Sequence, residues 1–161
     1  MDRSCLLCVG KKNSLEKLIN SRQFSGKKDF MKYIFSIPIK DNVTVSAIRL
    51  TPSVEFLLPI KEILHPGYCG EECRELILDS NIDVTDCHVI CGIESPGCGY
   101  MTYDIVFPQG RCEKGESSRT AAIREFAEET GIKLDSFSKN ITFLGFVGKK
   151  KEMSVYLYKV D

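Results

Sequence analysis

GRCEKGESSRTAAIREFAEETGI, residues 110–132, combines the signals of a helix with a cluster of carboxylates. Ser117 and Ser118 are good N-cap residues, and the residues that follow them favour helix. Gly131 supplies a C-terminal stop. The pattern therefore predicts a helix over residues 119–130.

Three glutamates of this predicted helix share one face, because Glu125, Glu128 and Glu129 stand at positions i, i+3 and i+4. The other face is largely apolar and is expected to pack on a sheet; it carries Ile123, Phe126, Ala127 and Thr130. Carboxylates at these spacings repel one another, whereas Mg2+ or Mn2+ takes oxygen ligands and bridges to phosphates. A solvated acidic helix face is the alternative, but it does not explain the rest of the pattern.

The complete pattern resembles the signature of the Nudix (MutT-like) hydrolases at every defined position. It runs from Gly110 through Glu116 to Arg124-Glu125-Phe126, Glu128-Glu129 and Gly131-Ile132. The resemblance implies an α/β protein with the Nudix fold, an α/β/α sandwich around a mixed β-sheet. We expect residues 1–161 to form a single domain, with residues 1–40 as an N-terminal extension and residues 110–132 as the Nudix box.

The same resemblance implies the activity and the metal ligands. Nudix hydrolases cleave a phosphoanhydride in a nucleoside diphosphate linked to another group, with Mg2+ or Mn2+ neutralising charge and activating water. By position, Glu125, Glu128 and Glu129 are the expected ligands, and the backbone around Gln109 and Gly110 is expected to add a carbonyl oxygen.

Three further motif residues have supporting roles by resemblance. Glu116 is the supporting acid, and Gly131 closes the helix. Arg124 is expected to hold a loop or helix carboxylate in an ion pair, while pointing to a different face from Glu125.

The general base in this family is a helix glutamate or an acid from a downstream loop. Glu152 is the only acidic residue between Asp135 and Asp161, which makes it the candidate outside the helix. Next to it are Lys149, Lys150 and Lys151, which with Arg111 are candidates for binding substrate phosphates or an RNA backbone. An exposed turn without function explains these residues equally well.

The loop before the helix bears on the substrate. Residues 107–111 read FPQGR and resemble the FPxG loop of Nudix enzymes that act on RNA 5′ ends, in mRNA decapping or as RNA pyrophosphohydrolases. RNA 5′-end hydrolysis is therefore the leading prediction. A hydrolase of small nucleotides, dinucleoside polyphosphates or diphosphoinositol phosphates is one alternative, and a non-catalytic Nudix-fold binding module is another.

Composition narrows the class of protein. Hydrophobic residues make up 43% of the chain and charged residues 27%, as in ordinary globular proteins. Basic and acidic residues number 22 each, so RNA would need a local basic patch. No apolar run approaches the roughly 18 residues of a membrane span. We therefore expect no membrane partner and a cytoplasmic protein, in the host cytoplasm if the chain is viral.

The eight cysteines are expected to be free thiols, because disulfides are rare in the cytoplasm. Structural zinc is the alternative, but none of the candidate spacings repeats the paired pattern of a zinc ribbon. The candidates are Cys5-x2-Cys8, His65-x3-Cys69-x3-Cys73 and Cys87-x3-Cys91.

Apolar periodicity and turn signals predict the remaining elements. A short helix to about residue 22 begins with Asn13 and Glu16, which resemble a capping box. Residues 43–50 and 54–60 are expected to form the opening hairpin of the sheet. The other predicted elements are a helix over 71–79, strands over 30–39, 87–93 and 101–107, and a hairpin over 141–147 and 153–160.

Overall fold

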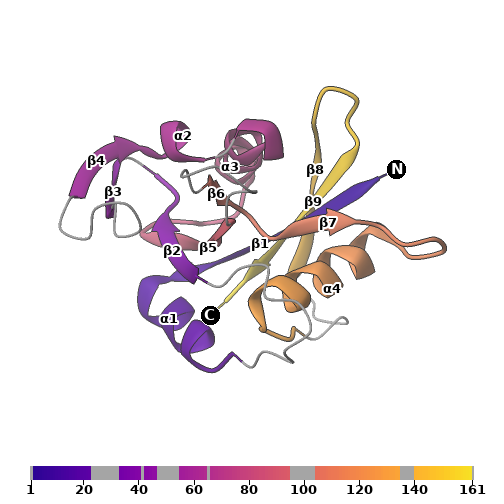
Figure 1. Ribbon diagram of the computed structural model, residues 1–161, viewed down its shortest axis with the longest axis horizontal. Coiled ribbons are helices and arrows are strands. Elements are labelled where there is room, and N and C mark those ends of the chain that lie inside the picture. The colour runs from indigo at the N-terminus through magenta and orange to yellow at the C-terminus, as the bar shows by residue number, and fades with distance from the viewer. Residues whose placement is uncertain are drawn as a thin grey trace, which may run out of the picture.

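The computed structural model describes residues 2–22, 33–40, 42–46, 55–64, 66–94, 104–134 and 140–160. A seven-stranded sheet forms its centre, with the strand order β2-β5-β1-β9-β8, β6 paired to β5 and β7 paired to β1 (Figure 1). The β1–β9 pair is parallel and the other pairs are antiparallel, so the sheet is mixed. Its strands are β1 (Arg3–Lys11), β2 (Tyr33–Pro38), β5 (Cys87–Glu94), β6 (Asp104–Val106), β7 (Gln109–Arg111), β8 (Ile141–Val147) and β9 (Met153–Lys159).

Helices cover both faces of this sheet. Alternate side chains of β1 point to opposite faces, so Cys5, Leu7 and Val9 share a core with α2 (Ile60–Ile63) and α3 (Gly70–Asp79). Leu6 and Cys8 pack with α1 (Lys12–Asn20) and α4 (Ser118–Thr130) on the other face. These five central side chains of β1 are fully buried, which explains why this part of the strand is an unbroken apolar run in the sequence. The predicted α/β/α sandwich around a mixed sheet is confirmed.

The first strand of the N-terminal segment belongs to the central sheet. Residues 1–40 were predicted to extend the core, but β1 lies in the middle of the sheet between β5 and β9. That part of the predicted extension is therefore core. Sequence spacing could not show this, because β1 pairs in register with β9, from Arg3 opposite Met153 to Val9 opposite Lys159.

Two local predictions were also wrong. The predicted hairpin exists, but β3 (Asn42–Ser46) and β4 (Glu55–Pro59) form a separate two-stranded sheet and not the opening of the main one. Helix α1 begins after Lys11 with no side-chain capping bond, so Asn13 and Glu16 form no capping box at its start. The turn at residues 51–53 lies outside the described residues.

The other predicted elements are confirmed where they are described, including α3, β5 and the β8–β9 hairpin. A short 3-10 turn, η1 (Pro66–Tyr68), precedes α3. The strand predicted over 101–107 is seen as β6, and residues 101–103 lie outside the described part. Within the described ranges, no helix has both the length and the apolar character needed to cross a membrane.

Helix α4 begins one residue before the predicted start, ends at the predicted residue and has the two faces that its sequence predicts. The Ser117 hydroxyl accepts a hydrogen bond from the Thr120 amide at 3.1 Å, and Gly131 ends the helix in the left-handed conformation, with φ of 76°. Phe126 is fully buried against the sheet. The packing of this face fixes how the glutamates on the other side of α4 are presented.

Candidate active site

Strand β7 runs directly beside the glutamate face of α4. Gly110 lies so close to Glu125 that a Cβ atom at this position would overlap the Glu125 carboxyl group. One residue earlier, the backbone N–H of Gln109 donates to Oε2 of Glu129 at 2.9 Å. The absence of a side chain at Gly110 is therefore what allows the α4 carboxylates to reach the β7 backbone.

Arg124 joins the carboxylates of the site. Its Nε and Nη2 donate to the two oxygens of Glu116 at 2.7 and 3.0 Å, in the bidentate geometry typical of strong arginine–carboxylate pairs. Its Nη1 donates to Glu125 at 2.9 Å and to Glu128 at 3.2 Å. Nη2 also donates to the Arg111 carbonyl at 3.0 Å, which ties the loop after β7 to the helix. One cation thus offsets much of the repulsion among three carboxylates.

The charges of this cluster follow from the same contacts. The hydrogen bonds from Arg124 hold the pKa of Glu116 below its usual range, and the carboxylates raise the pKa of Arg124. Sequence spacing placed Arg124 on a different face from Glu125. The structure differs there, because the long side chain bends back and its guanidinium reaches the neighbouring carboxylate.

Gln109 is a buried polar residue at the centre of the site, with 6% of its surface exposed. Its side-chain nitrogen donates to the Tyr68 carbonyl at 3.1 Å, and its side-chain oxygen accepts from Nη2 of Arg3 at 3.3 Å. Sequence reasoning missed Arg3 and Tyr68, which lie 106 and 41 positions from Gln109. Only the pairing of β1 with β7, which sets Cys5 opposite Gln109, brings Arg3 into the site.

Glu152 lies in the turn between β8 and β9. Its carboxylate accepts a hydrogen bond from the Lys150 amide at 2.9 Å, and its backbone carbonyl accepts one from the Arg3 amide at 2.9 Å. Lys149, Lys150 and Lys151 are exposed. The structure therefore brings the turn to the β1 end of the site, where Arg3 connects it to Gln109.

The structure describes cysteines of the candidate zinc spacings. Cys5 and Cys8 face opposite sides of the sheet and cannot share a metal ion. Burial and the carboxylate of Glu72 raise the pKa of Cys69 to about 12, so this thiol stays protonated at neutral pH. His65 lies outside the described residues. Cys112 accepts or donates a hydrogen bond with the Ser4 hydroxyl at 3.4 Å.

The donor set of α4 has the chemistry of a site for a hard divalent cation. Glu125, Glu128 and Glu129 offer only carboxylate oxygens, next to the peptide backbone of β7, and hard cations prefer oxygen ligands. In the part of the chain that the structure describes, no three His, Cys, Asp or Glu side chains already converge as a metal cluster. The carboxylates are instead satisfied by Arg124 and by the Gln109 amide.

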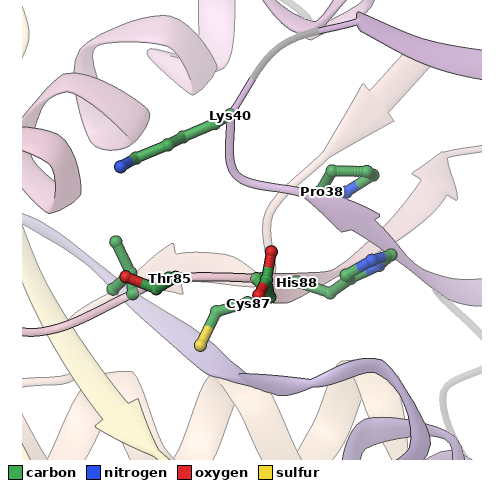
Figure 2. A pocket seen from close by; sticks show the side chains of 7 residues that line it. Pro38, Lys40, Thr85, Cys87 and His88 are labelled. Atoms are coloured by element: carbon green, nitrogen blue, oxygen red, sulfur yellow. The ribbon is translucent and has the colours of Figure 1, made fainter.

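A cavity of about 300 Å³ lies at the other end of β1, where β5 begins (Figure 2). Figure 2 shows Lys40 extending above Thr85 and Cys87. The cavity is lined by Pro38, Lys40, Val84, Thr85, Asp86, Cys87 and His88, and by no glutamate of α4. Burial and the charge of Lys12 lower the pKa of His88. This cavity is separate from the candidate active site.

Comparison with known proteins finds a family model that matches the part of the chain containing α4 and its glutamates. Residues 88–161 match the family model of the NUDIX domain. The matched part is slightly less than half of the chain. It contains β5 except for its first residue, β6 to β9, α4 and all the glutamates that contact Arg124. No curated protein and no solved structure matches the chain significantly.

Proposed function

We propose that this chain, a Nudix hydrolase of phosphoanhydrides by virtue of the NUDIX domain in residues 88–161, cleaves the 5′ end of RNA with Mg2+ or Mn2+. The observation that carries the proposal is the contact between α4 and β7. Carboxylates from one helical turn lie against a glycine-containing strand, with their charges held together by Arg124.

The proposed roles follow from these contacts. Glu125, Glu128 and Glu129 are the proposed ligands, with the backbone around Gln109 and Gly110 beside them. A bound divalent cation supplies charge neutralisation at the phosphate oxygens and a more acidic water.

Glu116 and Glu152 are the two further acids with proposed roles. Arg124 and Glu116 hold Glu125 and Glu128 on one side of the helix, so that their oxygens need little rearrangement during the reaction. The general base is a helix glutamate or Glu152, which its own turn holds in place through the Lys150 amide.

Three segments bring cations to this end of the sheet, which supports an RNA substrate. Arg3 and Arg111 are directly opposite each other in the β1–β7 pair. The Arg3 amide is bonded to Glu152, next to the exposed lysines 149–151. Because the chain as a whole has no net charge, binding of an RNA backbone requires a local cluster of this kind.

The neutral net charge also favours a second candidate, a small phosphoanhydride that needs no extended basic surface. Its possible members are free nucleotides, dinucleoside polyphosphates and diphosphoinositol phosphates. The rate of product release is measured with Mg2+ or Mn2+ for each of these compounds, for capped RNA and for triphosphorylated RNA. These rates rank the substrate classes directly. Glu129→Gln should lower turnover of the true substrate by roughly 100-fold or more.

Replacement of Lys149, Lys150 and Lys151 by serine distinguishes the two candidates. For an RNA substrate we expect KM to rise and its salt dependence to flatten, because phosphate contacts are lost, while KM for a free nucleotide changes little. The matched control replaces three exposed lysines of α1 and α2, Lys12, Lys17 and Lys61, by serine. Equal effects on both substrates, or no effect, would contradict the RNA proposal.

A further inference from the structure

Arg3 and Tyr68 lie together at the edge of the active site, although both come from segments outside the matched NUDIX domain. The guanidinium carbon of Arg3 is 6.0 Å from the centroid of the Tyr68 ring, within the range of a cation–π contact. Figure 1 shows the start of β1 at the same end of the sheet as β7 and the β8–β9 turn. A cation and an aromatic ring are therefore placed side by side near the glutamates.

Gln109 sets the position of this pair relative to the glutamates. Its side chain bonds to Arg3 and to the Tyr68 carbonyl, while its backbone N–H bonds to Glu129. Because Gln109 is buried, these hydrogen bonds are shielded from competing water. One residue thus connects Arg3 and Tyr68 to a carboxylate of α4.

The charge of Arg3 remains available for a ligand. Among the described residues, no ion pair joins Arg3 to a carboxylate. Its guanidinium gives one hydrogen bond, to Gln109, and has several further N–H donors. The opposite residue, Arg111, adds a second positive charge and is exposed. Arginine binds phosphate oxygens in a bidentate manner that lysine does not reproduce.

We propose that Arg3 and Tyr68 form the nucleotide-recognition part of this active site, in which Arg3 binds phosphate oxygens and the Tyr68 ring stacks on the base. The proposal rests on the proposed function, since it requires a substrate that contains a nucleoside. Aromatic rings bind bases by stacking with little sequence preference, because every base has a π face. Substrate recognition therefore depends on the first strand and on η1, not on the Nudix box alone.

Binding of a non-hydrolysable nucleotide tests this without turnover. The probe is a methylene-bridged nucleoside triphosphate, and methylenebisphosphonate serves as the matched ligand without a nucleoside, both titrated calorimetrically in Mg2+ buffer. Tyr68→Leu should weaken nucleotide binding roughly 10-fold and leave the bisphosphonate unaffected. Tyr68→Phe keeps the ring and should bind the nucleotide like the wild type. Both variants retain the backbone carbonyl that holds Gln109.

Arg3→Gln should weaken binding of both ligands by roughly 10-fold, since it removes the charge but keeps a donor for Gln109. Arg3→Lys should recover only part of this loss. Lys12→Gln removes a positive charge from α1 and is the control, with no expected change. Thermal melts of all variants confirm that each is folded at the titration temperature.

The outcomes separate this inference from the proposed function. Wild-type nucleotide affinity in folded Arg3→Gln or Tyr68→Leu would overturn the assignment for that residue, even if RNA 5′ ends are hydrolysed. The expected losses of affinity, in a protein that releases nothing from RNA 5′ ends, would uphold nucleotide recognition and reject the RNA substrate. A Tyr68→Leu variant that loses bisphosphonate binding equally would mean that the ring shapes the site and does not contact a base.

Discussion

Replacing Arg124 by methionine should destabilise the fold and impair catalysis together. The change removes hydrogen bonds of 2.7 and 3.0 Å to Glu116, 2.9 Å to Glu125 and 3.2 Å to Glu128. A hydrogen bond to a charged group contributes about 1.5–3 kcal/mol, but such contributions are not additive within one network. Arg124 is 22% exposed and Glu116 is 11% exposed, so solvent weakens the pair only in part.

We therefore expect the free energy of unfolding to fall by about 2–4 kcal/mol, near the lower end of the loss for a broken buried ion pair. For a chain of this size each kcal/mol lowers Tm by about 2–4 °C, so Tm should fall by roughly 4–16 °C. Turnover measured well below Tm should fall by about 100-fold, because Glu125 and Glu128 lose the cation that holds them. Thermal denaturation and product release measure the two effects separately.

Arg74 offers a matched control. It is 17% exposed, pairs with Glu71 at 3.1 Å and donates to the Ile39 carbonyl at 2.7 Å. Because α3 lies on the sheet face opposite α4, Arg74→Met should lower Tm by a similar amount and leave turnover nearly unchanged. An Arg124→Met protein with wild-type Tm and wild-type turnover would refute the reasoning, as would an equal loss of turnover in Arg74→Met.

Phe126→Ala should lower the free energy of unfolding by about 3–5 kcal/mol in chemical denaturation, because the side chain is fully buried, and a smaller loss would mean that the face is poorly packed. Gly110→Ala should fold but lose roughly 10-fold or more in turnover, since its Cβ would displace the Glu125 carboxylate; unchanged turnover would remove this contact from the site. Burial and Lys12 lower the pKa of His88 below its unfolded value of 6.5. The contribution of neutral His88 to stability is therefore complete above about pH 6.5 and is lost as the pH falls below it. His88→Gln should make the free energy of unfolding depend less on pH, measured by chemical denaturation from about pH 7.5 to 5.

Local chemistry made the glutamate helix predictable. The N-cap at Ser117, the left-handed Gly131 and the buried Phe126 all act within one helix, so periodicity and capping signals suffice to place them. The proximity of Gly110 to Glu125 was implied by the motif, and the structure adds its cause, the missing Cβ.

Non-local pairing explains what the sequence could not predict. The apolar run in β1 indicates a buried strand, but it does not say which strands lie beside it. Arg3 reaches Gln109 only because β1 pairs with β7, and no local spacing connects residues so far apart. The same reason explains why β3 and β4 were wrongly placed in the main sheet. A hairpin is signalled by local sequence, but the sheet to which it belongs depends on non-local pairing.

The parallel pairing of β1 with β9 also constrains how the protein acquires its structure. β1 is synthesised before β9, with the other strands of the sheet between them in sequence, so the central strand must wait for all of these before its parallel neighbour exists. Pairing between such distant segments carries a large loop-closure entropy and slows folding. Until β9 leaves the ribosome, the apolar run of β1 has an unpaired edge that other chains can bind. A fragment restricted to residues 88–161 keeps every glutamate that contacts Arg124, yet it lacks the strand that joins β5 to β9, and should therefore aggregate instead of folding alone.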